Sequence, residues 1–332
     1  MARLQIRGQV SYNDMTPADG VEVRIFDLDI GPGGANDRIL TKTTDGQGRF
    51  SDLSSEWADR EGVVHGFNLP DLMNLEFRIA VGSKSHKGPF LWIAGASIPI
   101  VLPFGPPKPV TKAKRDLVQL ICLSDGLTGA ERTLYEFIEA SSEGIVATVL
   151  GPRYRKIHVL KGDDATLANF TTALRTAANS TGVAAVDVVL NAHGLTDKLV
   201  FKDGQKTTNV VKSALTALPA GVRSKFRAVF STACFGETHL SMWRDVGFSV
   251  GSGSEGIYAD SAASFMPFVA AWGAEMTFAA SVQAANLADV GNVVDGLAIA
   301  YYNNINRSED ADEVDSTRSV AGNGQIRSYS VP

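Results

Sequence analysis

The sequence contains few cysteines: only Cys122 and Cys234 occur in 332 residues. Two thiols are too few for a disulfide framework, so the composition favours a reducing compartment. The N-terminal segment Met1–Gly8 has no apolar stretch of the length found in signal peptides. We therefore expect a soluble, cytoplasmic protein.

Long hydrophobic runs and a basic excess are also missing. A membrane-spanning helix needs about 18 or more apolar residues in a row. The nearest candidate, residues 259–294, is interrupted by Asp260, Glu275 and Asp289. The net charge is -5 at pH 7, whereas nucleic-acid-binding domains usually carry a basic face. We expect neither a membrane span nor a nucleic-acid partner.

What the sequence does contain is globular material in two parts. Hydrophobic residues make up 44% of the chain and charged residues 20%, which is an ordinary globular composition. A length of 332 residues favours two domains. Changes in composition mark the boundaries, and we predict a β-sandwich (1–103), a proline-rich linker (104–115), an α/β domain (116–305) and a polar C-terminal tail (306–332).

The N-terminal part has the pattern of short, half-buried strands. Leu4–Val10, Val21–Phe26 and Leu75–Val81 alternate apolar with polar residues, and turn-forming residues separate them. The segment Thr43–Phe50, which reads Thr-Thr-Asp-Gly-Gln-Gly-Arg-Phe, and the nearby Gly20–Val23 resemble the transthyretin-like and carboxypeptidase-regulatory-like domains. That resemblance implies an all-β sandwich in which this segment forms a tight turn entering a strand.

From Arg115 onward strands alternate with helices, which predicts a mostly parallel sheet with helices on both faces. The nearly continuous apolar run Leu117–Leu123 is typical of a strand buried on both sides. A hairpin is expected to turn at Asp203–Gly204. Further strands are predicted at 156–160, 186–192, 226–233 and 248–250, and helices at 128–140, 164–178 and 208–218.

Two of these strands end in residues that support covalent catalysis. The strand 186–192 is followed by His193 and Gly194, and the strand 226–233 is followed by Cys234. Because carboxyl ends of neighbouring parallel strands share one edge, the imidazole and the thiol are expected side by side. The imidazole can take the thiol proton and later protonate a leaving amine. The backbone N–H groups of Gly194 and Cys234 are the predicted oxyanion donors.

These two blocks, Val188–Gly194 and Val229–Cys234, resemble the caspase-like superfamily, which includes caspases, metacaspases, clostripain and gingipains. The separation, 234 − 193 = 41 residues, is shorter than the roughly 50 of caspases. Thr232 replaces the glutamine of the caspase signature and Phe235 fills its variable place. The chain is therefore more similar to metacaspases and clostripain than to true caspases.

The resemblance implies a caspase-like cysteine endopeptidase that uses Cys234 and His193. Such an enzyme needs no metal and no cofactor, and its partners are a peptide or protein substrate and an activating protein. Two other functions remain open at this point. The domain could be a catalytically silent interaction or scaffolding module, although retention of both His193 and Cys234 counts against it. It could also be a cysteine hydrolase of a small amide, which pocket size would distinguish.

Specificity for the P1 side chain is expected to come from residues around the nucleophile. In the resembling enzymes the residue that selects the substrate's P1 side chain often lies just after the first strand, where this chain has Ser124–Gly126. Asp125 predicts a basic P1 residue, and the alternative is that Asp125 only caps the helix starting near Thr128. Glu255 and Asp260 are second candidates for the same role.

The remaining cysteine and two further histidines are expected to be structural, and one glycine-rich segment is not expected to bind a dinucleotide. Cys122 lies within an apolar strand and is predicted to be a buried core residue. His158 lies in a strand pattern, and His239 is too far along the helix after Cys234 for a direct contact with the thiol. Gly251–Gly256 matches a dinucleotide fingerprint by letter only, and we expect a flexible substrate-binding loop there. The aromatic residues between 262 and 302 are expected to fill the core.

Overall fold

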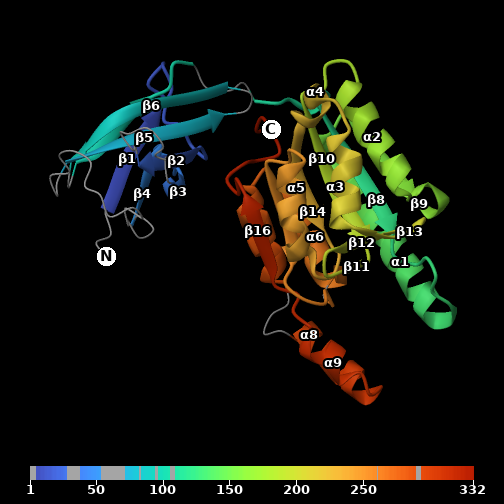
Figure 1. The fold of residues 1–332 in the computed structure, drawn as a ribbon. Helices are drawn as coiled ribbons and strands as arrows, with labels where there is room; N and C mark the ends of the chain where they lie inside the picture. Colours follow the sequence, from blue (N-terminus) through green and yellow to red (C-terminus); the bar gives the residue numbers. More distant parts are fainter. Residues whose placement is uncertain are drawn as a thin grey trace. The chain divides into compact units, whose positions relative to one another are not determined.

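The chain forms two compact units, Met1–Lys108 and Pro109–Pro332 (Figure 1). The computed structural model describes residues 5–27, 38–53, 72–81, 84–93, 96–104, 109–259, 261–288 and 293–332. The division between the units falls within the segment 104–115 that the sequence predicts to be a linker. Among the described residues, no helix combines the length and the apolar character that crossing a membrane requires.

The N-terminal unit consists of two β-sheets around one hydrophobic core. The strand orders are β4-β1-β7 and β3-β2-β5-β6. Ile6 and Val10 from the first sheet and Val23 and Ile25 from the second share the core, which confirms a β-sandwich arrangement. The strands are β1 (Gln5–Ser11), β2 (Glu22–Asp27), β3 (Arg38–Thr43), β4 (Arg49–Leu53), β5 (Leu72–Val81), β6 (Lys84–Ile93) and β7 (Ser97–Val101).

The tight turn predicted before β4 is present. The Asp45 carboxylate accepts hydrogen bonds from the backbone N–H groups of Gln47 at 2.9 Å and Arg49 at 2.8 Å. Gly48 has φ +71°, and a Cβ there would lie 2.2 Å from the Val10 carbonyl oxygen. Only glycine therefore fits the turn. The likeness to transthyretin-like domains stays a prediction.

The C-terminal unit contains a six-stranded sheet of order β16-β15-β14-β10-β8-β9. All pairs are parallel except β15 with β16. This confirms the mostly parallel α/β sheet expected from the strand–helix alternation. The strands are β8 (Arg115–Cys122), β9 (Lys156–Lys161), β10 (Ala185–Ala192), β14 (Phe226–Ser231), β15 (Val250–Ser254) and β16 (Arg318–Gly322).

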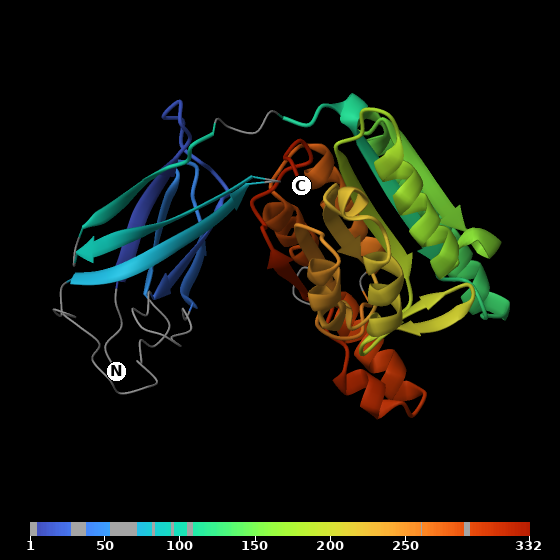
Figure 2. The same ribbon diagram turned by 45° about the horizontal axis from the view of Figure 1, so that its top comes forward.

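Helices cover both faces of this sheet (Figure 2). Successive strand residues point to opposite faces, so Val188 joins one core cluster and Val189 the other. One face packs against α2 (Leu167–Asn179), α3 (Thr208–Thr216), α4 (Ala220–Arg223) and α5 (Leu240–Asp245). The other face packs against η2 (Val146–Leu150), α6 (Ser261–Gly273) and α7 (Phe278–Asn286), and α1 (Gly129–Ile145) contacts α6.

A small second sheet follows β10 directly. It is formed by β11 (Gly194–Leu195), β12 (Lys198–Phe201) and β13 (Gly204–Thr207) in sequential order. The predicted hairpin is formed by β12 and β13, but it turns at Lys202–Asp203, one residue earlier than expected, because Gly204 already pairs with Phe201. The remaining short elements are η1 (Lys112–Lys114), η3 (Gly151–Arg153), η4 (Gly162–Asp164), η5 (Gly236–His239), α8 (Val293–Asn304) and α9 (Ser308–Asp312).

The segment 306–332 is not the solvated tail that its composition indicates. It contains α9 and then β16, which pairs antiparallel with β15 over Arg318–Gly322. Arg318 is only 4% exposed. An unpaired edge of β15 would leave backbone groups without partners, and β16 satisfies them. The polar residues of this segment therefore belong to the folded unit.

The glycine-rich segment Gly251–Gly256 is likewise not a flexible loop. Its first four residues lie in β15 and are buried. A Cβ on Gly253 would lie 2.2 Å from the carbonyl carbon of Gly236. The glycine therefore allows η5, the segment just after Cys234, to pack directly on the sheet backbone. The expectation of a substrate-binding loop there was wrong.

Candidate active site

His193 follows β10 and Cys234 follows the neighbouring parallel strand β14. Each lies the same number of residues beyond two residues that are opposite each other in these strands. Leu190 of β10 is opposite Ser231 of β14. His193 lies 193 − 190 = 3 residues beyond the first and Cys234 lies 234 − 231 = 3 residues beyond the second. Parallel neighbours are about 4.8 Å apart. The pairing therefore brings the two segments to the same edge of the sheet.

Gly194 makes this close approach possible. A Cβ on Gly194 would lie 2.5 Å from the Cys234 carbonyl oxygen and 2.8 Å from the Ala233 Cβ. No side chain can be accommodated there without displacing the backbone at Cys234. Gly194 also pairs with Leu199 in the β11–β12 sheet. The histidine–glycine and alanine–cysteine blocks of the sequence thus pack against each other directly.

The His193 ring is held from two sides. Its Nε2 donates a hydrogen bond of 2.7 Å to the carbonyl oxygen of Leu123, the first residue after β8. A carbonyl oxygen only accepts, so this contact assigns the proton to Nε2 and leaves Nδ1 as the acceptor nitrogen. The ring of Tyr135 from α1 meets the imidazole edge-on, with 5.1 Å between ring centroids. The neutral tautomer selected in this way is the one whose Nδ1 can accept a proton.

Cys234 lies in a partly buried turn. Phe235, the next residue, has φ +53° and donates its backbone N–H to the Gly256 carbonyl at 2.8 Å. The Tyr258 backbone N–H donates to the Cys234 Sγ at 3.4 Å. Burial raises the pKa of the Cys234 thiol, and the hydrogen bond from the Tyr258 N–H lowers this pKa by a smaller amount. The thiol is therefore neutral near pH 7 unless a base removes its proton.

Two tyrosines near the thiol, Tyr135 and Tyr302, were not predicted from the sequence. Burial raises the pKa of Tyr135 and of Tyr302, and in both cases the nearby charge of a Cys234 thiolate raises it further. Tyr302 belongs to α8, which lies toward the same end of the sheet as β11 and β12 (Figure 1). Aromatic residues in helices are usually core residues, so no sequence signal distinguished this pair.

Asp125 lies beyond β8 and lines a cavity of about 240 Å³. Its carboxylate is exposed and forms an ion pair of 2.6 Å with the Nζ of Lys202. The residue that precedes α1 is Thr128, so the alternative that Asp125 caps this helix is wrong. The other charged residues lining the cavity are Arg132, Glu139, Asp163 and Lys202.

The second candidates for substrate binding lie beyond β15. Glu255 is exposed, and its carboxylate accepts a hydrogen bond of 2.9 Å from the Ser319 hydroxyl of β16. Asp260 lies outside the described residues. The structure therefore brings Asp125 to the end of β8 and Glu255 to the end of β15, on opposite sides of β10 and β14 in the sheet.

His239, His158 and Cys122 have structural surroundings. His239 is fully buried, its Nε2 donates to the Leu195 carbonyl at 3.0 Å, and burial lowers its pKa. His158 contacts the buried Asp116 carboxylate at 2.9 Å. Burial raises the pKa of Cys122 to about 11. Within the described residues, no cluster of three or more histidine, cysteine or acidic side chains could hold a metal ion.

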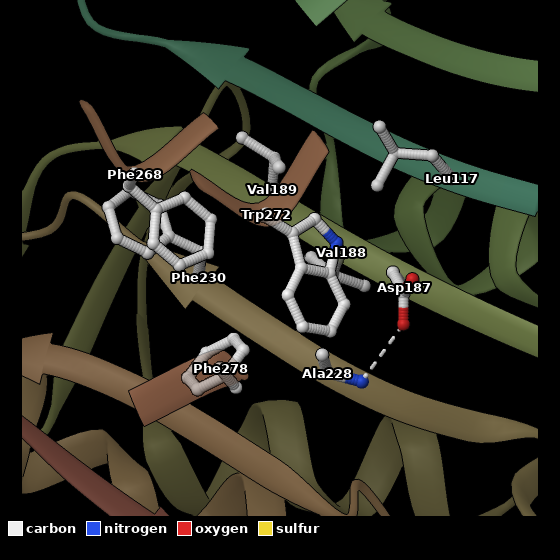
Figure 3. A pocket seen from close by; sticks show the side chains of 9 residues that line it. All are labelled: Leu117, Asp187, Val188, Val189, Ala228, Phe230, Phe268, Trp272 and Phe278. Atoms are coloured by element: carbon white, nitrogen blue, oxygen red, sulfur yellow. Dashed lines mark hydrogen bonds between the residues drawn. The ribbon is translucent and has the colours of Figure 1, made fainter. Parts of the chain in front are cut away.

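A second cavity lies inside the core and is too small for a substrate. It measures about 10 Å³ and lies between the middle of the sheet and α6 and α7. Figure 3 shows Trp272 and Phe268 over the strands, and Asp187 accepting a hydrogen bond from the Ala228 backbone N–H at 3.2 Å. Such a volume holds at most about one water molecule. This cavity therefore has no room for a substrate.

Comparisons with known proteins give only distant structural likenesses. No protein-family model and no curated protein matches the chain. A secreted C11 cysteine protease from Bacteroides thetaiotaomicron, solved with an irreversible peptide inhibitor, is 13% identical with a TM-score of 0.36. That match covers 63% of this chain and 66% of the protease chain, so the match spans slightly less than two thirds of that protease.

Two further solved structures are similar in part. Caspase-1 from Spodoptera frugiperda is 10% identical with a TM-score of 0.41, over 64% of this chain and 88% of that one. A 9R-lipoxygenase from Cyanothece PCC8801 is 13% identical with a TM-score of 0.21, over 51% of this chain and 26% of that one. All three TM-scores are low, so these likenesses assign no function to the chain.

Proposed function

We propose that this protein is a cysteine endopeptidase with Cys234 as nucleophile and His193 as its acid–base partner. One observation carries the proposal: His193 and Cys234 end adjacent parallel strands, and the His193 Nε2 is engaged by the Leu123 carbonyl. This leaves Nδ1 as the only ring nitrogen that can exchange a proton with the thiol. The resemblance of both sequence blocks to the caspase-like superfamily supports the same assignment.

The proposed reaction has two stages. His193 Nδ1 takes the thiol proton, the Cys234 thiolate attacks the peptide carbonyl carbon, and the oxyanion is stabilised by the N–H groups of Gly194 and Cys234. The C–N bond then breaks as His193 returns the proton to the leaving amine. In the second stage His193 takes a proton from water, the hydroxide attacks the thioester, and the Cys234 thiol is released. No redox or metal step is involved.

Burial of the thiol makes the histidine essential to this scheme. Because burial raises the pKa of Cys234, little thiolate exists at neutral pH without a neighbouring base. Peptide binding, or an activating protein that reshapes the site, would complete the arrangement in which the proton is transferred. We therefore propose that peptidase activity is low until a substrate peptide or an activating protein has bound.

The first test is covalent labelling of the nucleophile. A peptidyl chloromethyl ketone is expected to form one adduct per chain, which mass spectrometry maps to Cys234. The Cys234→Ala variant is expected to lose the adduct completely, since the other thiol, Cys122, is only 4% exposed and burial raises its pKa to about 11. The matched control is Cys122→Ala, which removes the other, buried thiol and is expected to retain full labelling.

The labelling experiment also distinguishes the proposed peptidase from the two other functions. An adduct that persists in Cys234→Ala would overturn the site. Unlabelled wild-type protein that nevertheless binds peptides or proteins would favour a catalytically silent scaffolding module. Labelling by small amide-like electrophiles but not by peptidyl ones would favour a small-amide hydrolase.

We also propose a basic P1 residue, with Asp125 as its counter-ion. The cavity beside it contains three carboxylates (Asp125, Glu139, Asp163) and two cations (Arg132, Lys202). Its formal charge is thus 2 − 3 = −1, which favours a cationic side chain. A substrate arginine or lysine would compete with Lys202 for the Asp125 carboxylate. Glu255 and Asp260 are the second candidates for this role.

The P1 proposal is tested with fluorogenic peptides that differ only at P1. Hydrolysis after Arg or Lys is expected to exceed hydrolysis after Asp by at least about tenfold in kcat/KM, the worth of one favourable charge contact. Asp125→Asn is expected to reduce this ratio. Asp245→Asn is the matched control, because Asp245 also forms a 2.6 Å pair with a lysine, Lys212. Faster cleavage after Asp would contradict the proposal.

A further inference from the structure

Glu139 of α1 is bound to the turn that holds His193. Its Oε1 accepts the backbone N–H of Leu123 at 2.7 Å and that of Ser124 at 2.9 Å. Its Oε2 accepts the Ser124 hydroxyl at 3.0 Å. Three hydrogen bonds therefore anchor one carboxylate to the two residues that directly follow β8. Such charge-assisted bonds are shorter and stronger than those between neutral groups.

The Ser124 N–H and the Leu123 carbonyl belong to one planar peptide group. The N–H faces Glu139 at 2.9 Å, and the carbonyl oxygen accepts from His193 Nε2 at 2.7 Å. A peptide group is rigid, so fixing its N–H fixes its carbonyl as well. Hydrogen bonds in such a chain polarise each other in the same direction. The carboxylate is thus linked to the imidazole through a single peptide group.

The same helix also holds the ring plane of His193. Tyr135 precedes Glu139 by one helical turn, so both side chains lie on one face of α1. Tyr135 meets the imidazole edge-on, with 5.1 Å between centroids and 67° between planes. One face of α1 therefore controls both the orientation of the ring and the partner of its Nε2–H.

We propose that Glu139 is a positioning residue of this site and acts on His193 through the Leu123–Ser124 peptide group. It fixes the Nε2–H tautomer and stabilises the positive charge that the ring acquires when it takes the thiol proton. In this role it takes the part that a directly bonded carboxylate takes in other Cys–His and Ser–His sites. The inference rests on the proposed peptidase function, yet its central claim about His193 can be measured without activity.

The decisive measurement is the ring-nitrogen spectrum of His193. It is recorded by ¹⁵N NMR in the inactive Cys234→Ala background, with and without Glu139→Ala. With Glu139 present, the neutral ring is expected to be protonated at Nε2. Without it, the Nδ1–H tautomer is expected to become populated and the Nε2–H proton to exchange faster with water. An unchanged tautomer and exchange rate in a folded Glu139→Ala protein would overturn the inference.

Peptide hydrolysis by the protein with Cys234 intact is a second, independent test of the role of Glu139. Glu139→Ala is expected to lower kcat by about 10- to 100-fold, the usual cost of losing a supporting partner. KM for a substrate with a basic P1 residue is expected to rise as well, because the Glu139 carboxylate also lines the cavity beside Asp125, so the fall in kcat is the test of the positioning role. Glu139→Gln keeps an acceptor oxygen for the N–H groups, so it should restore part of the loss. Equal loss in kcat and stability with no rescue by Gln would indicate a purely structural role.

The matched control is Glu143→Gln on the same helix. Glu143 lies one turn after Glu139 and pairs with Lys161 at 2.7 Å, away from the Leu123–Ser124 turn. This variant is expected to change neither the His193 spectrum nor kcat. If Glu139→Ala does not fold, the exchange of the His193 Nε2–H proton with water is measured in Glu139→Gln instead. A shifted His193 spectrum in a protein that hydrolyses no peptide would refute the proposed function while upholding the positioning role.

Discussion

Replacing His193 by alanine is expected to lower kcat/KM for peptide hydrolysis by about 10³-fold, within the usual range for loss of a general base. The reason is that burial raises the pKa of the Cys234 thiol, so the nucleophile does not form at neutral pH unless a base accepts its proton. The side chain of His193 is only partly buried, and its loss leaves the hydrophobic core intact. The measurement is kcat/KM on a fluorogenic peptide, together with circular dichroism to confirm folding.

His158→Gln is the matched control for this experiment. His158 also lies in the sheet and contacts a carboxylate, that of Asp116 in β8, but it belongs to β9 and has no contact with the proposed site. It is expected to retain near wild-type kcat/KM. If His193→Ala kept its activity, another base would have to serve Cys234. His239, whose ring lies 3.2 Å from a Cβ position on Gly194, would then be the next candidate.

Replacing Arg227 by methionine is expected to lower the free energy of unfolding of the C-terminal unit by about 3–5 kcal/mol. The guanidinium is 0% exposed. It pairs with Asp187, to which its Nε donates at 2.9 Å, and its Nη1 donates to the Ser330 carbonyl at 2.7 Å. Without it, the buried Asp187 carboxylate loses the cation that is hydrogen-bonded to it, and the C-terminal segment loses one anchor. Urea denaturation, followed through the transition of this unit, gives the value.

A double variant distinguishes an uncompensated charge from a packing defect. Arg227→Met with Asp187→Leu removes both charges, and most of the loss is expected to be recovered. Arg132→Met is the control for a surface arginine, because Arg132 pairs with the exposed Glu136, and its stability is expected to be unchanged. If the double variant were as unstable as the single one, the buried ion pair would not be the cause.

The backbone arrangement of the C-terminal unit follows from sequence pattern to a large extent. Continuous apolar runs such as Leu117–Leu123 predicted strands buried on both faces, and the structure confirms them. Parallel strands place their carboxyl ends at one edge, so residues after Ala192 and Ser231 had to be neighbours if these strands were adjacent. The pair His193 and Cys234 could therefore be predicted from the sequence alone.

Glycine-rich and polar segments were harder to interpret. Gly251–Gly256 has the composition of a loop, yet Gly253 is buried in β15 because the backbone of Gly236 packs on it. Arg318 in the polar C-terminal segment is buried because its guanidinium lies over the Phe230 ring at 4.1 Å and bonds the Ser231 carbonyl. In both cases the partner is more than 16 residues distant in sequence, beyond the reach of any local pattern.

The sequence by itself determined the five parallel strands, the helices near 128–140, 164–178 and 208–218, and the two catalytic candidates that follow two of those strands, because periodicity is a local property. The order of the strands and the place of β16 at the edge of the sheet came only from the tertiary structure. Only the tertiary structure decided what surrounds the candidates. Glu139 meets Leu123 and Ser124, and Asp125 meets Lys202, through the packing of α1 and the β12–β13 hairpin on the sheet. Side-chain contacts between distant segments depend on how whole elements pack, and no short-range pattern encodes them.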